Sequence, residues 1–140
     1  MSSTWIEKVA LAVSGLTAFG IGAFILTAPH AFYASYDIAL GNDTSLLNEL
    51  RAFSAGLAAF GMLMLAGIWL QAVTLISIAS ALTVFIAFPA GRIIGLIVDG
   101  IPSSNLVAAL VFELAVAGLC SVAFASRFKR SAHPSRSSQL

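Results

Sequence analysis

Charged residues are scarce in this chain. They make up 9% of its 140 residues, whereas 59% are hydrophobic and the mean hydropathy is +0.98. Soluble domains are typically about 25% charged and about 45–50% apolar. The composition therefore excludes a water-soluble globular protein. The formal net charge of +1 gives no basic excess that would indicate a nucleic-acid partner.

Several chemically useful residue types are equally scarce. Cys120 is the only cysteine, which excludes an intrachain disulfide and a metal site built from several cysteines. No lysine or histidine is expected within the membrane, which excludes a retinal-type Schiff base and argues against haem ligation by histidine there. His30, Glu49 and Glu113 lack the spacing of metal ligands, so we expect no metal and no cofactor.

Long apolar segments are what the chain has in abundance. A membrane-spanning helix needs about 20 apolar residues, and four such segments nearly fill the sequence. We therefore expect an all-α, integral membrane four-helix bundle over residues 1–126. The expected helices cover about residues 5–28, 45–70, 72–98 and 103–126. Residues 127–140 are basic and serine-rich, which predicts a disordered cytoplasmic tail.

The loop between the first two segments has its own pattern. Pro29 can occupy the first turn of a short helix. Phe32, Tyr33 and Tyr36 then recur at helical spacing, which predicts a short amphipathic segment at the membrane interface. Asp43 or Thr44 is expected to cap the next helix.

Small residues indicate where helices approach closely, because they let two backbones come together. Two stripes have suitable spacing: Gly15, Ala18 and Gly22 in the first segment, and Ala87, Gly91 and Gly95 in the third. Pro89 lies within the second stripe and removes one backbone hydrogen bond, so we expect a kink there.

Five charged residues stand out because they lie within or beside the apolar segments: Glu49, Arg51, Arg92, Asp99 and Glu113. One charge at the bilayer centre costs about 2.5–3.5 kcal/mol on insertion scales, so such charges are expected to have partners. An antiparallel bundle places Arg51, Arg92 and Glu113 at similar depths in the outer half of the membrane. We therefore expect Glu113 to pair with Arg92 or Arg51. Arg92 and Asp99 should share one helix face.

The charged cluster is compatible with more than one role. It is either a structural ion-pair network or a binding site for a lipid, a quinone or another hydrophobic or anionic small molecule. Small size and short loops also suit an accessory subunit of a larger membrane complex, or a homo-oligomer. A third interpretation is a cofactor-free isomerase that uses Glu113 as an acid or base. The sequence leaves these alternatives open.

The same residues carry a resemblance to a known family. The motifs are Leu47–Ala52, Gly91–Arg92, Asp99–Pro102, Phe112–Leu114 and the Tyr33–Tyr36 loop. In their order and spacing they resemble the signature of DUF4345, a family of small bacterial four-span proteins that is known only as a domain of unknown function. The resemblance covers about residues 5–126. It implies a four-helix bundle in a bacterial inner membrane, and it implies no activity.

The distribution of basic residues predicts the orientation of the bundle. Positively charged residues favour the cytoplasmic side. Five basic residues flank the two chain ends: Lys8, Arg127, Lys129, Arg130 and Arg136. The loop before residue 44 and the turn at Asp99 contain none. We therefore expect both termini in the cytoplasm. Reporter fusions at the C-terminus and at Asp37 test this, and a C-terminal reporter active only outside the cytoplasm would overturn it.

Overall fold

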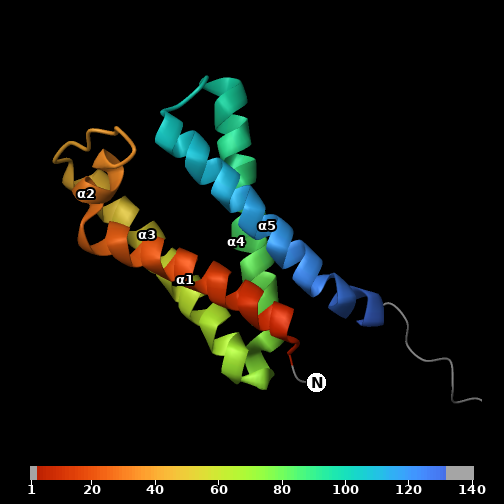
Figure 1. The fold of residues 1–140 in the computed structure, drawn as a ribbon. Helices are drawn as coiled ribbons and strands as arrows, with labels where there is room; N and C mark the ends of the chain where they lie inside the picture. The colour runs from red at the N-terminus through yellow and green to blue at the C-terminus, as the bar shows by residue number, and fades with distance from the viewer. Residues whose placement is uncertain (1–2, 132–140) are drawn as a thin grey trace, which may run out of the picture.

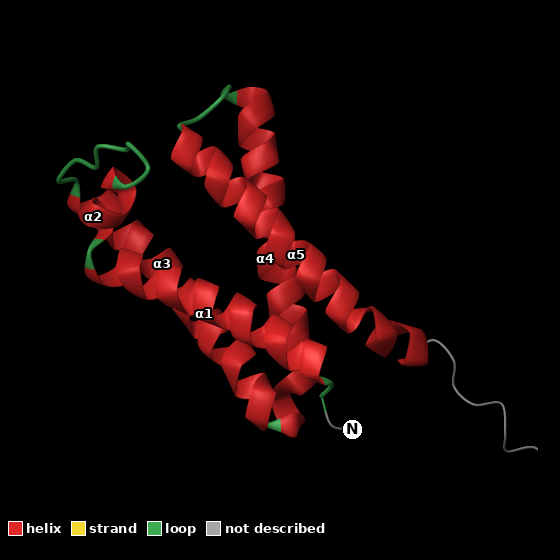
Figure 2. Ribbon diagram, in the orientation of Figure 1, coloured by secondary structure: helices red, strands yellow, loops and turns green. Residues whose placement is uncertain are grey.

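The chain folds into helices throughout the part that the structure describes. The computed structural model describes residues 3–131, with side chains up to Lys129. It contains α1 (Trp5–Thr27), α2 (Pro29–Ala34), α3 (Thr44–Trp69), the short 3-10 helix η1 (Gln71–Val73), α4 (Thr74–Val98) and α5 (Ser104–Ser131), and within these residues it contains no strand (Figures 1 and 2). α1, α3, α4 together with η1, and α5 are each long and apolar enough to cross a membrane. The expected all-α four-span fold is thus confirmed.

The helix ends follow local sequence signals. Pro29 begins α2, as its fixed backbone angle favours. The Asp43 carboxylate accepts hydrogen bonds from the backbone N–H groups of Ser45 at 2.8 Å and Leu46 at 3.2 Å, which confirms Asp43 as the cap of α3. The expected end of the last helix at residue 126 is wrong. α5 continues to Ser131, and the remainder of the expected tail lies outside the described residues.

The first of the two small-residue stripes brings α1 and α3 together. A Cβ atom on Gly22 would lie 2.5 Å from the backbone nitrogen of Ala58 and 2.6 Å from the carbonyl oxygen of Ser54. A Cβ atom on Gly15 would lie 2.8 Å from the side chain of Leu65. Ala18, between them, is buried. The two backbones therefore touch along this stripe, as the small residues predicted.

The second stripe does not pack in this way, and that expectation is wrong. A Cβ atom on Gly91 would have no neighbour within 4 Å among the described residues. A Cβ atom on Gly95 would meet only the Asp99 carboxylate, at 3.9 Å. α4 instead contacts α3 in its first turns, where the Ser77 hydroxyl donates to the carbonyl oxygen of Leu63 at 2.6 Å. The later half of α4 is left without a close helical neighbour at its glycines.

The two ends of the bundle differ as a consequence. We call the end with the start of α1, the α3–α4 connection and the end of α5 the terminal end, and the end with α2 and the α4–α5 turn the loop end (Figure 1). The largest fully buried side chains belong to the terminal half: Leu11, Met64, Cys120 and Phe124 are examples. Towards the loop end, α1 and α3 diverge from α4 and α5 in Figure 1. The tight core is therefore confined to one half of the molecule.

The two glycine stripes give a test of this packing. Gly22→Ala should destabilise the protein by about 1–3 kcal/mol, because the new methyl group would overlap backbone atoms of α3. Gly91→Ala is the matched control, since its methyl group would enter open space. Thermal unfolding in detergent measures both. Equal losses for the two variants would contradict this assignment of the close contacts.

Candidate functional site

An ion pair joins α4 to α5 in the loop half of the bundle. Arg92 Nε donates to Glu113 Oε2 at 2.8 Å. The Glu113 side chain is 8% exposed and that of Arg92 is 30% exposed. α4 and α5 run antiparallel on either side of a short turn, which brings a residue near the end of α4 level with one in the first half of α5. Arg92 is one of the two partners that the sequence predicted for Glu113.

Arg51 lies elsewhere and does not join this pair. Its Nη1 atom donates to the backbone carbonyl oxygen of Leu26, in the last turn of α1. The last four carbonyl groups of a helix lack intrahelical partners, and a basic side chain stabilises them. Arg51 therefore caps α1, and within residues 3–131 it forms no ion pair with Glu113. Of the two partners expected for Glu113, the structure therefore shows Arg92 and not Arg51 within the described residues.

The other two carboxylates of the expected cluster lie apart from each other. Glu49 is exposed on α3 and lines a cavity of about 580 Å³ that does not include Arg92. Asp99 is exposed and caps the end of α4. It shares a small space of about 200 Å³ with Arg92, as their common helix face predicted. Of the five candidates, Arg92, Glu113 and Asp99 thus remain neighbours.

A largely apolar cavity opens beside the ion pair. It has a volume of about 440 Å³ and is bounded by residues of all five α-helices. Its polar lining consists of Thr17, Tyr33, Tyr36, Arg92, Asn105 and Glu113. We call this space the main cavity. Small-molecule sites are typically about 300–1,000 Å³, mostly apolar, with a few polar groups that orient the ligand. The main cavity has these properties.

Aromatic side chains of the α2 segment border the main cavity. The Phe32 ring packs edge-on against the rings of Tyr33 and Tyr36, with centroid distances of 5.3 and 5.2 Å. Burial raises the pKa of the Tyr33 hydroxyl, although the positive charge of Arg92 acts in the opposite direction. Tyr33 therefore stays protonated at neutral pH and can donate a hydrogen bond. The aromatic face of the α2 segment thus lines the main cavity.

Two hydrogen bonds connect the α2 segment to the start of α5. The Ser103 hydroxyl donates to the carbonyl oxygen of Tyr36 at 2.9 Å. The Asn105 side-chain amide donates to the carbonyl oxygen of Ser35 at 2.9 Å. These bonds join segments on the two sides of the main cavity at the loop end, and so they hold the two halves of the bundle together there.

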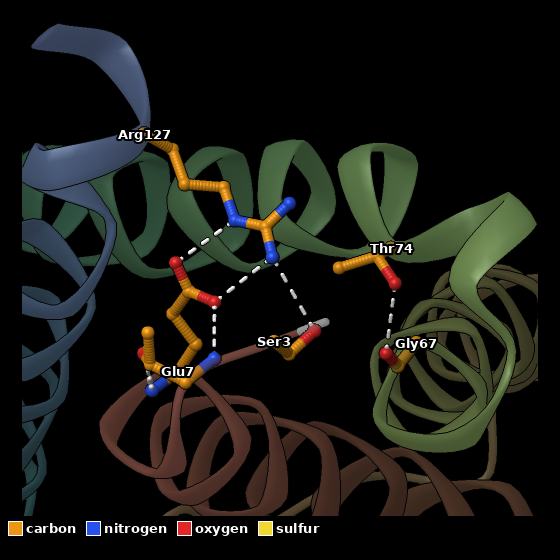
Figure 3. Close-up of polar contacts among 6 residues, drawn as sticks. Ser3, Glu7, Gly67, Thr74 and Arg127 are labelled. Carbon is orange, nitrogen blue, oxygen red and sulfur yellow. Dashed lines mark hydrogen bonds and ion pairs between the residues drawn. The ribbon is translucent and has the colours of Figure 1, made fainter. Parts of the chain in front are cut away.

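A second ion pair at the terminal end was not predicted from the sequence. Arg127 donates from Nε to Glu7 Oε1 at 2.8 Å and from Nη2 to Glu7 Oε2 at 2.9 Å (Figure 3). Glu7 is only 1% exposed and also accepts from the backbone N–H of Thr4 at 2.9 Å. The signal that was missed is the Thr4–Glu7 spacing of a capping box, which marks Glu7 as a fixed residue at a helix start.

The arrangement of ionisable groups limits the chemistry of the site. No group of three or more histidine, cysteine, aspartate or glutamate residues within the described chain could hold a metal ion. The main cavity combines one neutralised ion pair, hydroxyl and amide groups, and an apolar surface. Such a lining can bind a molecule that is mostly apolar and carries one polar group.

The ion pair between α4 and α5 predicts how substitutions combine. Glu113→Gln alone should destabilise the protein by about 3–5 kcal/mol, because it breaks the buried ion pair from one side. Glu113→Gln combined with Arg92→Met should lose less, since neither charge then remains. Glu113→Gln with Arg51→Met is the control, and its two losses should add. Thermal unfolding in detergent measures all of these. If the stability loss of the Glu113→Gln, Arg92→Met double variant equals the sum of the two single losses, the two residues do not pair.

Comparison with known protein families gives a match over most of the chain. The sequence model of the family described as "Domain of unknown function (DUF4345)" matches residues 6–124 of this chain. The match includes α1–α4, both residues of the Arg92–Glu113 pair and most of α5. Searches of curated proteins and of solved structures found no match. The chain, a helical protein with four candidate membrane spans, belongs to the DUF4345 family.

Proposed function

We propose that this protein binds a membrane amphiphile in the main cavity. The apolar part of the ligand fills the cavity, and its polar group accepts hydrogen bonds from Arg92. One observation carries the proposal: a cavity of about 440 Å³ with a mostly apolar lining has an arginine in its wall. In hydrocarbon an arginine is costly, and ionisable residues there are functional candidates by default.

The hydrogen bonding of Arg92 supports a ligand with an accepting group. Its side chain forms one hydrogen bond with residues 3–131, from Nε to Glu113. The two terminal amino groups of the guanidinium form none with these residues. A guanidinium offers five N–H donors in a plane and can hold a carboxylate or phosphate through two parallel bonds. A quinone carbonyl is a weaker acceptor of the same bonds. Tyr33 adds a neighbouring donor.

The setting of the site is part of the same proposal. With both termini in the cytoplasm, the loop end faces the outer side of a bacterial inner membrane, and the main cavity lies in the outer half of the bilayer. An amphiphile such as a lipid or quinone is already concentrated in the bilayer at that depth. It reaches the cavity from the membrane, and no soluble carrier is needed.

A second candidate is an accessory subunit in a larger membrane complex or a homo-oligomer. It is favoured by the exposed small residues Ala87 and Gly91 on α4. Gly91 has open space where another helix could approach, and small residues promote such contacts between spans. An isomerase that uses Glu113 has no comparable support, because Arg92 already holds that carboxylate.

Ligand binding can be tested with variants on one helix. Ala109 lines the main cavity, whereas Ala115 is exposed on the same helix, α5, and does not line it. Ala109→Trp should abolish binding of a fluorescent long-chain fatty acid in detergent, and Ala115→Trp should not. Arg92→Met should weaken that binding roughly tenfold or more, since a charged hydrogen bond contributes about 1.5–3 kcal/mol. Arg51→Met is its control.

The outcomes separate the candidates. A short-tailed quinone is titrated beside the fatty acid, so that preference for one of them identifies the accepting group. Mass spectrometry of molecules extracted with the native protein tests the same point. Equal binding by the Ala109→Trp and Ala115→Trp variants would overturn the proposal. A stoichiometric protein partner in the same preparation, with no bound amphiphile, would favour the accessory-subunit candidate.

A further inference from the structure

We infer that Arg92 has two alternative partners, Glu113 inside the bundle and Asp99 at its loop end, and that its side chain moves between them. The guanidinium then acts as a gate between the main cavity and the membrane surface. The role of this movement in ligand entry rests on the proposed binding function. The existence of two partners does not, because it concerns only residues of this chain.

Arg92 stands between two spaces. On one side is the main cavity, which contains Glu113. On the other is the space of about 200 Å³ lined by Asp99, Gly100 and Pro102 at the α4–α5 turn, which we call the vestibule. Arg92 and Leu106 line both spaces. Each of the two spaces that Arg92 lines is therefore also lined by one carboxylate.

Asp99 lies within reach of Arg92. Its Oδ2 atom is 3.9 Å from the position that a Cβ atom on Gly95 would occupy, so the carboxylate leans back along α4 by one turn. Residues three apart on a helix have Cβ atoms about 5–6 Å apart, which places Arg92 next to the same position. Gly95 has no side chain to separate the two groups. The three-carbon stem of Arg92 can therefore carry the guanidinium to Asp99.

The position of Asp99 favours a cationic partner. It caps the end of α4, where the backbone carbonyl groups give the helix its negative end and a carboxylate is unfavourable. The last turn of α4 has no basic residue, and Asp99 forms no side-chain hydrogen bond or ion pair with residues 3–131. Glu113 faces Arg92 from α5 and Asp99 follows it on α4, so the two carboxylates compete for one cation.

Burial decides which partner holds Arg92 at rest. Glu113 is buried, and a carboxylate left alone there is strongly disfavoured, whereas the exposed Asp99 is solvated. The Glu113 pair is therefore the resting state, as observed. When Arg92 turns to Asp99, the side chain clears the way between the vestibule and the main cavity. The polar group of a ligand can follow the guanidinium back as it returns to Glu113.

A double-mutant cycle tests the two partners without any ligand. If Asp99 takes over Arg92 when Glu113 is removed, then Asp99→Asn should have little effect in the natural protein and a larger one in the Glu113→Gln background. The drop in melting temperature of the double variant should exceed the sum of the single drops. Glu49 lines neither space, so Glu49→Gln is the control. Its drop in melting temperature should simply add to that of Glu113→Gln. Additive losses for Asp99→Asn would overturn the inference.

The Arg92 Nε–H signal in a nitrogen-15 NMR spectrum gives a readout that stability alone would not move. Arg92→Lys assigns the signal. Glu113→Gln should shift it, and Asp99→Asn in that background should shift it again. Gly95→Val, which fills the space between the two groups, should also remove the Asp99-dependent shift, whereas Gly91→Val should not. If Asp99→Asn leaves the Arg92 signal unchanged in the Glu113→Gln background, the inference is overturned. Failure of the natural protein to bind the fatty acid, with the Asp99-dependent shift still present, would overturn only the proposed function.

Discussion

An ionised side chain inside hydrocarbon needs a partner, because no water is present to solvate it. Three charged groups in the spans meet this requirement in different ways. Glu7 is held by Arg127 through two hydrogen bonds, Glu113 by Arg92 through one, and Arg51 by a backbone carbonyl group of α1. Each contact joins two helices that are distant in sequence or lie on either side of a turn. The positions of the charges thus fix which helices meet at each end of the bundle.

The two ion pairs differ in stiffness. Glu7 is bound at both oxygens by one guanidinium and at one of them by the Thr4 backbone, so rotating either side chain breaks several hydrogen bonds at once. Glu113 is bound through Nε alone, at a single oxygen. One bond fixes a distance but leaves the guanidinium free to turn about it. The terminal end is therefore anchored, and the loop end keeps a mobile cation beside a cavity.

The helices and the four candidate spans could be predicted from the sequence because they depend on hydropathy, which is a property of each segment alone. That Glu113 pairs with Arg92 or Arg51 was predictable because depth in an antiparallel bundle can be counted along the helices, but depth did not decide between the two arginines. The acceptor of Arg51 was not predicted, because the end of every helix offers carbonyl groups without intrahelical partners and the sequence does not say which of them a side chain reaches. The Glu7–Arg127 pair joins residues at opposite ends of the chain, and Arg127 was placed in a tail that in fact continues α5.

The two glycine stripes show where sequence reasoning stops. Gly15 and Gly22, like Gly91 and Gly95, have a spacing that suits close packing, yet only the first two contact a neighbouring helix. Spacing identifies a face that permits approach, but the partner helix decides whether approach occurs. In α4 the contacts with α3 are made in its first turns, so its later glycines remain open.

The open glycines and the mobile pair are two consequences of the same geometry. The small residues of α1 pack closely against α3 on one side of the bundle. The helices α4 and α5 diverge from α1 and α3 towards the loop end (Figure 1). The divergence leaves room for the main cavity and gives Arg92 space on two sides. A bundle packed equally tightly at both ends would enclose Arg92 as it encloses Glu7. The loose loop end is therefore the half of this protein in which a ligand and a moving side chain can both be accommodated.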